Sequence, residues 1–177
     1  TATASAAFQK TGMTSVTVLK DISYGSNAFD SCASLVSVTV EEGVTEIGNY
    51  MFQNTKLTSV TLPNSVTKIG ASAFNGCSLT TINFGQGVKT IENSAFQNCG
   101  ELTEIILPDA TETLGQNAFG DCPKLAKISL GKNMKTLEAY CFVGYSKGCP
   151  LLGDIICRAT TPPTLKDDYG TGPFGGG

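Results

Sequence analysis

The sequence predicts a repeat solenoid, in which about seven similar segments of 22–23 residues stack on one another around a shared core. Two observations predict this fold: a phenylalanine that recurs at a nearly constant interval, and a strand-like triplet at a fixed place in each segment. The phenylalanines are Phe8, Phe29, Phe52, Phe74, Phe96, Phe119 and Phe142, at intervals of 21, 23, 22, 22, 23 and 23 residues. Segments that stack in one register would bring these rings into a single buried column.

The triplets alternate apolar and mostly polar residues, which is the period of a half-buried strand. β-branched residues dominate them, and Pro or Gly often follows, which ends a strand. The triplets occupy residues 16–18, 38–40, 60–62, 82–84, 105–107, 128–130 and 155–157. Stacked segments would join these strands into a parallel ladder with strands about 4.8 Å apart.

Other positions repeat with the phenylalanine. A small or apolar residue precedes each Phe, and an apolar residue stands five positions before most of them, with Tyr24 in the shorter first repeat. Cysteine commonly follows three positions after Phe, and this spacing predicts a short helical turn that carries both side chains on one face. Four glycines stand four positions before their Phe and are expected at a corner: Gly25, Gly48, Gly70 and Gly115. Glu92 and Glu138 take that place in two repeats, so a positive φ is not required there.

The composition excludes several classes of function. Histidine is absent, which removes the commonest general base, the commonest zinc ligand and the usual partner of a nucleophilic Ser or Cys. With a net charge of −3 and no basic cluster, binding to nucleic acid has no electrostatic basis. No apolar run approaches the roughly 20 residues that cross a bilayer, and the N-terminal residues do not resemble a signal peptide. We expect no catalytic residue, no cofactor and no metal site.

The seven cysteines fall where the repeat accepts a small apolar side chain, so we interpret them as free core residues. Cys32, Cys77, Cys99 and Cys122 follow their Phe by three positions, and Cys149 does so once an insertion around Tyr145 is removed. The alternatives are a disulfide, for which Cys141, Cys149 and Cys157 are the best candidates, and a zinc site. The disulfide is disfavoured because in-register side chains point in parallel, and the zinc site because no C-x-x-C or His is present.

At this point the residues resemble a known family. The unit from Leu57 to Cys77 fits the pattern L-x-x-V-x-L-P-x-x-V-x-x-I-G-x-x-A-F-x-x-C of the BspA-like leucine-rich repeats, also called the Treponema pallidum type. The resemblance covers about residues 4–165, and the end of that stretch is similar to the terminal element of such proteins in Bacteroides. It implies a curved, right-handed solenoid of the α/β leucine-rich-repeat class, a bacterial cell-surface or secreted location, and adhesion to proteins such as fibronectin and fibrinogen. It supplies no catalytic residues.

We expect one solenoid domain over residues 1–165 and a Gly-rich tail over residues 166–177. The outward side chains of the predicted ladder are the middle residue of each triplet and the residue two positions earlier. Solenoids use such faces for binding, although Ser and Thr suit any exposed strand. The candidate partner-binding residues are Ser59, Thr61, Thr81, Asn83, Glu104, Ile106, Lys127 and Ser129.

Two further motifs are better explained as turns or loops than as binding sites. Gly85-Gln86-Gly87 is expected to form a turn after a strand and not a phosphate-binding loop. Asp167 and Asp168 could contact Ca²⁺, but they lack the alternating ligands of an EF-hand and are expected in a solvated loop. The acidic residues Glu41, Glu42 and Glu112 are scattered by the repeat, and no pair is set apart for acid/base catalysis.

These features predict a non-catalytic module for protein–protein interaction or adhesion on the outside of a bacterial cell. The expected partner is a protein, either from the host extracellular matrix or from another cell surface. One alternative is a glycan-binding module, for which Tyr145 and Tyr169 are the aromatic residues outside the Phe column. The other is a structural spacer within a larger multidomain surface protein.

Overall fold

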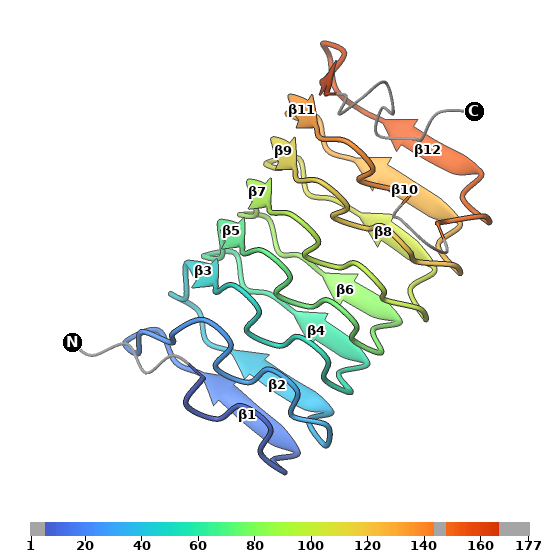
Figure 1. The fold of residues 1–177 in the computed structure, drawn as a ribbon. Coiled ribbons are helices and arrows are strands. Elements are labelled where there is room, and N and C mark those ends of the chain that lie inside the picture. Colours follow the sequence, from blue (N-terminus) through green and yellow to red (C-terminus); the bar gives the residue numbers. More distant parts are fainter. Residues whose placement is uncertain (1–5, 144–147, 167–177) are drawn as a thin grey trace.

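The computed structural model describes residues 6–143 and 148–166, which form a parallel β-solenoid of about six turns (Figure 1). One side of the solenoid is a ladder of longer strands, which we call the wide ladder. Each wide strand pairs in parallel with, or lies beside, its counterpart in the next coil. The wide ladder consists of β1 (Ser15–Val18), β2 (Ser37–Val40), β4 (Ser59–Thr61), β6 (Thr81–Asn83), β8 (Glu104–Ile106), β10 (Lys127–Leu130) and β12 (Asp154–Cys157). The predicted strands are therefore confirmed.

A second side is a ladder of two-residue strands, which we call the narrow ladder and which was not anticipated from the sequence. Its six strands pair in parallel without interruption. They are β3 (Glu46–Ile47), β5 (Lys68–Ile69), β7 (Thr90–Ile91), β9 (Thr113–Leu114), β11 (Thr136–Leu137) and β13 (Thr164–Leu165). We number the coils by their strands, so that coil 1 contains β1, coil 2 contains β2 and β3, and coil 7 contains β12 and β13.

The third side carries the phenylalanines, which form the predicted internal column. The rings from Phe29 to Phe142 are at most 1% exposed. Consecutive ring centroids from Phe8 to Phe119 lie 5.2–5.5 Å apart with nearly parallel planes, and Phe119 and Phe142 are 6.4 Å apart. This offset stacking adds to the burial of the rings. The buried residues ahead of each Phe, such as Ile69 and Ala73, complete the core.

The prediction of a short helical turn around each Phe is wrong. The described residues contain no helix, and the segments from two residues before each Phe to three after it, which we call the Phe turns, have a different backbone. Residues two before and two after Phe have positive φ, as at Asn27 (62°) and Ser31 (57°). In an α-helix the N–H of Phe29 would bond within its own segment, whereas here it donates to the carbonyl of Met51 in the next coil. Asn and Asp tolerate positive φ better than most residues, and they occupy five of these positions: Asn27, Asn54, Asn98, Asn117 and Asp121.

Phe and Cys still share the buried side of the turn, and the cysteines do more than fill space. The thiol of Cys77 lies 3.1 Å from the carbonyl oxygen of Phe52 in the preceding coil, and Cys99 makes the same contact with Phe74 at 3.3 Å. Cys149 lies 3.3 Å from the Phe119 carbonyl, which confirms its predicted alignment. Burial raises the pKa of the Cys77 and Cys149 thiols to about 11. The thiols therefore act as neutral donors between coils.

All seven cysteines are free, as interpreted. The prediction that all seven fill small apolar core positions is wrong for Cys157, which is exposed. Its strand, β12, is exposed at all four residues because it belongs to the last described coil and is covered on one side only.

None of the four corner glycines has positive φ, as expected. At Gly115 a Cβ would lie 2.6 Å from the backbone nitrogen of Asn93, so close approach of two coils explains this glycine. Gly85 has a φ of +62° and lies in a turn over residues 85–87, which confirms the interpretation of the G-x-G motif.

Candidate interaction face

The outward side chains of the wide ladder form a continuous surface that we call the wide face. The structure brings the predicted partner-binding residues together there in two in-register rows. Ser59 aligns with Thr81, and Thr61 with Asn83. Further along, Glu104 aligns with Lys127, and Ile106 with Ser129. All eight side chains point away from the core and are exposed or half-buried.

The half of the wide face formed by β1, β2, β4 and β6 carries only hydroxyl and amide groups. Ser15 aligns with Ser37, and Thr17 with Thr39, before the rows continue to β4 and β6. These short side chains are exposed and uncharged. This half offers many weak hydrogen-bonding groups and no charged anchor.

The half formed by β8, β10 and β12 is different, because it combines a charged row with an apolar row. Lys127 forms an ion pair with Glu104 at 2.9 Å, and this hydrogen bond raises the pKa of the lysine. In the next row Ile106 is 59% exposed and Ile156 is 46% exposed, and Ser129 lies between them in register. Exposed apolar side chains that are framed by polar ones are typical of protein interfaces.

A hollow of about 400 Å³ lies beside Ile106, at the end of β6 and β8. Its apolar wall includes Ile82, Phe84 and Pro108, and its polar rim includes Asn83 and Asp109. The hollow therefore offers both apolar contact and polar groups, which a mixed side chain of a partner could use together.

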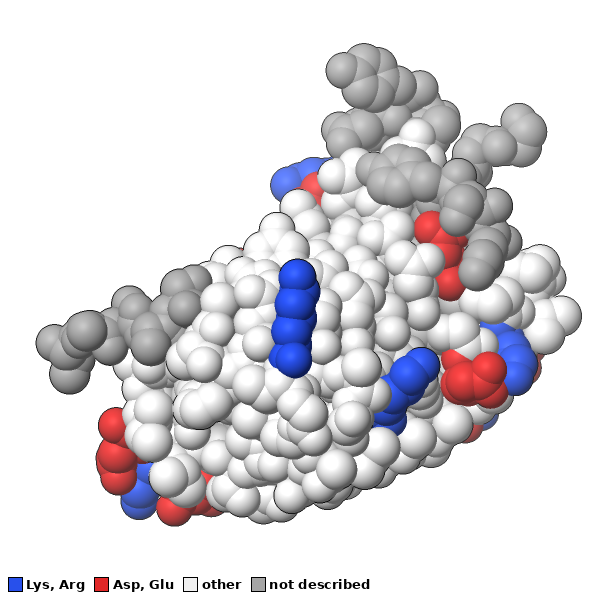
Figure 2. Space-filling model, turned by 60° about the horizontal axis from the view of Figure 1, so that its bottom comes forward, with Lys and Arg blue, Asp and Glu red and all other residues white. Residues whose placement is uncertain are grey.

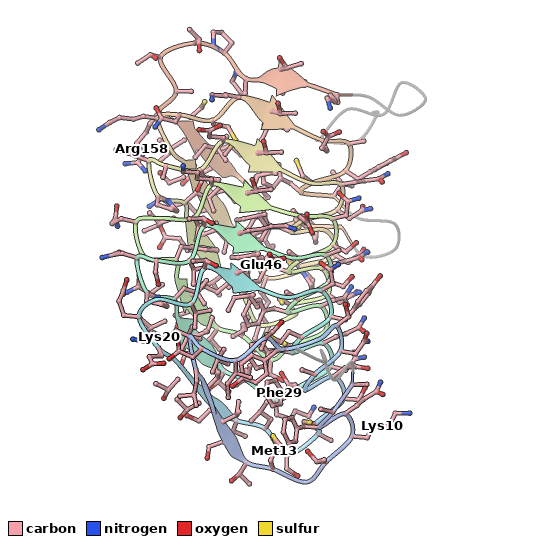
Figure 3. All side chains as sticks on the ribbon, turned by 90° about the vertical axis from the view of Figure 1, so that its left-hand side faces the viewer. Lys10, Met13, Lys20, Phe29, Glu46 and Arg158 are labelled. Carbon is pink, nitrogen blue, oxygen red and sulfur yellow. The ribbon has the colours of Figure 1, made fainter. Side chains whose placement is uncertain are left out.

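Arg158 also lines this hollow, and our sequence analysis missed it. It comes from the segment after β12 and reaches back across two coils (Figure 3). Its guanidinium donates to the carbonyl oxygens of Leu130 and Leu107 at 3.2 and 3.1 Å and lies 3.3 Å from the Asp109 carboxylate. Lys132, which donates a hydrogen bond, and Arg158 together lower the pKa of Asp109. One feature of the sequence could have drawn attention to this residue, because Arg158 is the only arginine in the chain.

The other ion pairs among the described residues join neighbouring coils at the surface. Lys68 lies between Glu46 and Glu92, at 3.2 and 3.0 Å, and both glutamates raise its pKa. Exposed pairs of this kind contribute little to stability, about 0–1 kcal/mol each. Figure 2 shows one side of the molecule, most of which is uncharged, with acidic side chains beside basic ones towards its edges.

Within residues 6–143 and 148–166, no group of three or more acidic, Cys or His side chains could hold a metal ion. In the same residues no helix is long and apolar enough to span a membrane. Tyr145, Tyr169, Asp167 and Asp168 lie outside the described residues, as does the predicted Gly-rich tail apart from Lys166.

The fold is shared with solved bacterial structures. A leucine-rich repeat protein from Bacteroides ovatus is 29% identical, with a TM-score of 0.69 over 85% of this chain and 39% of that protein. A leucine-rich repeat protein from Eubacterium ventriosum is 27% identical, with a TM-score of 0.65 over 86% of this chain and 45% of that protein. A leucine rich cell surface protein from Faecalibacterium prausnitzii is 22% identical, with a TM-score of 0.68 over 88% and 50%, and supports the fold alone. The chain thus spans half or less of the length of these proteins.

No curated protein matches the sequence. The family model of the BspA type leucine rich repeat region matches in six copies, over residues 1–75 and 22–148. These matches cover most of the chain, including every Phe turn of the column described above. The chain therefore belongs to the family of proteins with BspA-type leucine-rich repeats.

Proposed function

We propose that this chain is a non-catalytic protein-binding module, displayed on a bacterial cell surface or secreted, which binds its partner through the β8–β10–β12 half of the wide face. Leucine-rich repeats generally mediate protein interactions, and one of the similar structures is a cell surface protein. The partner is a protein of the host extracellular matrix or of another cell surface.

One observation carries the choice of face: Ile106 and Ile156 are exposed in one row, and Ile106 borders the hollow that contains Phe84 and Pro108. A partner side chain that entered the hollow would contact apolar residues and also the polar groups of Asp109 and Arg158. The ion pair of Glu104 and Lys127 forms a polar rim on the opposite flank. An apolar centre with a polar rim is the arrangement that concentrates binding energy in a few residues.

The glycan-binding alternative has less support. Glycan sites usually stack sugars on exposed aromatic rings, and the exposed aromatic residues among the described ones are Phe8 and Tyr50. Both lie in Phe turns and not on the wide face. The spacer alternative predicts no binding at any face, so the same experiment separates all three functions.

The test is binding of the purified chain to immobilised fibronectin and fibrinogen, measured by biolayer interferometry. The triple variant Glu104→Ser, Ile106→Ser and Lys127→Ser should bind at least about tenfold more weakly, because it removes both the apolar row and its rim. The matched control is Ser15→Ala, Ser37→Ala and Thr39→Ala, on the other half of the same face. The control should bind like the wild type, and both variants should melt within a few degrees of it.

Equal binding by the Glu104, Ile106 and Lys127 variant would rule out this half of the face. Absence of binding to both proteins, together with a saturable signal on a glycan array, would replace the proposal by the glycan function. Absence of binding to both proteins and to the array would favour a spacer.

A further inference from the structure

Coil 1 lacks the narrow strand that every later described coil has. From the last inward residue of the wide strand to the Phe there are 12 positions in coils 2 to 6, as from Val40 to Phe52, but only 11 in coil 1, from Val18 to Phe29. A segment that is one residue shorter cannot keep both its corners and the register of a strand. The hydroxyl of Tyr24 accepts a hydrogen bond from the N–H of Leu19 and donates to the carbonyl of Thr17, which holds this segment towards β1.

As a consequence, β3 is an open edge of the narrow ladder. In coil 3 the N–H groups of Thr67 and Gly70 donate to the carbonyl oxygens of Thr45 and Ile47, and the same two bonds recur at every junction up to coil 6. In coil 2 the equivalent N–H groups are those of Thr45 and Gly48. Neither has a hydrogen-bond partner in the described part of the chain. Unpaired backbone groups in this arrangement form a template for another extended chain.

A hollow of about 350 Å³ lies along this edge, between β3 and the coil 1 segment. Lys20 and Glu46, on its two walls, are labelled in Figure 3. Ile22 and Tyr24 line it as well, whereas Ile47 is fully buried and does not line it. The hollow thus exposes the backbone edge of β3.

The ladder itself indicates which side chains would fit. Its inward column ends at Ile47, which stacks on Ile69 and is already fully buried, so the outward positions decide. Each outward acid in this part of the ladder stands beside a base. Glu46 shares its single partner, Lys68, with Glu92, and its other side faces the open edge. A basic outward side chain would complement it.

We propose that the β3 edge is a second binding site, which takes an extended segment of another polypeptide as an additional strand of the narrow ladder. The segment presents a Lys or Arg outwards, beside Glu46. Main-chain hydrogen bonds to Thr45 and Gly48 hold it, as in other cases where a peptide adds a strand to a sheet edge. This site is on a different side of the solenoid from the wide face.

The probe is a synthetic capped peptide that copies residues 66–71 of this chain, because this segment pairs with β3 from its other side and has the required Lys. Fluorescence anisotropy with the labelled peptide should show saturable binding. A control peptide with Glu in place of the Lys should bind at least about tenfold more weakly.

Two protein variants locate the site. Thr45→Pro removes an N–H group that bonds to nothing else in the described protein, and it should weaken peptide binding about tenfold or more while the chain stays folded. Glu46→Lys should weaken binding by charge reversal. Its matched control is Glu112→Lys, which reverses a similar ion-paired charge three coils away and should leave peptide binding unchanged.

Amide chemical shifts of the ¹⁵N-labelled wild type make the test independent of how the variants fold. Chemical-shift changes that cluster at Thr45, Glu46 and Gly48 on addition of the peptide would support the site. No saturable binding up to about 1 mM peptide, or shifts that cluster on the wide face, would overturn it. Self-association of the chain that Thr45→Pro abolishes would also overturn it, because the occupant would then be a second copy.

Discussion

The Phe turns and the wide face differ in how much they vary from coil to coil. In the Phe turns the same residue types recur, and the six rings from Phe29 onwards are buried with nearly constant spacing. On the wide face the equivalent positions change from Thr17 to Asn83 to Ile106, although the backbone beneath them stays in register. Residues that recur in every coil are therefore those that pack in the core, whereas positions that depart from the repeat are those where single coils can acquire separate roles.

The largest effect that tests this comparison is expected in the Phe column. Phe96→Ala removes a fully buried ring that contacts both neighbouring rings, so it should lower the free energy of unfolding by about 3–5 kcal/mol. Urea denaturation measures it. The matched control is Phe8→Ala at the open end of the column, where the ring is 44% exposed and the loss should be clearly smaller. If the two variants lost equal free energy of unfolding, burial of the ring in the column would not explain why Phe recurs in each coil.

An intermediate effect should come from the buried thiols at alkaline pH. The pKa of Cys77 is raised from 9.0 to about 11 by burial, so its stabilisation is complete below pH 9 and is lost as the pH rises through 11. By pH 10 this thiol alone should cost the folded state about 1 kcal/mol. Cys77→Thr, which copies Thr55 of the preceding coil, should lose that much less stability between pH 8 and pH 10.

The exposed Cys157 provides the control for this pH dependence, since Cys157→Ser changes a thiol outside the core. Its denaturation midpoint should fall with pH in parallel with that of the wild type. If Cys77→Thr also followed the wild-type curve, the alkaline loss would have to come from groups other than Cys77.

The smallest effect is expected on the wide face. Ile106→Thr trims an exposed side chain and keeps a β-branched residue on the strand, so stability should change by no more than about 0.5 kcal/mol. Thermal melts of the two proteins should nearly superimpose. A large loss would show that Ile106 is held by contacts within the chain, and it would weaken its assignment as an interaction residue.

The period of the repeat was sufficient to predict the Phe column, the wide strands and the rows of the wide face, because stacked equivalent residues must lie in register. The backbone conformation of the Phe turns could not be predicted in this way. Asn27 and Ser31 fit the start of a helix as well as positive φ, and only the bond from Phe29 to the next coil distinguishes the two. Burial of Cys157 was predicted wrongly because the repeat pattern does not state that an end coil is covered on one side only.

The two sites also differ in how much of each could be predicted from the sequence. Asn83 and Ile106 could be selected by alternation along a strand, but Arg158 enters the same hollow from 51 residues away in the sequence, beside Leu107. The β3 edge follows from one missing residue in coil 1. The short interval before Phe29 is visible in the sequence, whereas the unpaired N–H groups of Thr45 and Gly48 require the narrow ladder to be seen first.

The backbone bonds of the Phe turns have a consequence for the electric field of the molecule. Each junction from Phe8 to Phe119 has three such bonds, eighteen in all, and every one runs from an N–H of one coil to a carbonyl of the next. In the strand ladders the direction of such bonds alternates and their dipoles nearly cancel, but here they add, as they do in an α-helix. The polarity is the reverse of a helix: partial positive charge collects at the C-terminal end of this side and negative charge at the N-terminal end, where Lys10 lies. The solenoid is therefore an electrically polar rod, and anions are favoured at one end of it and cations at the other.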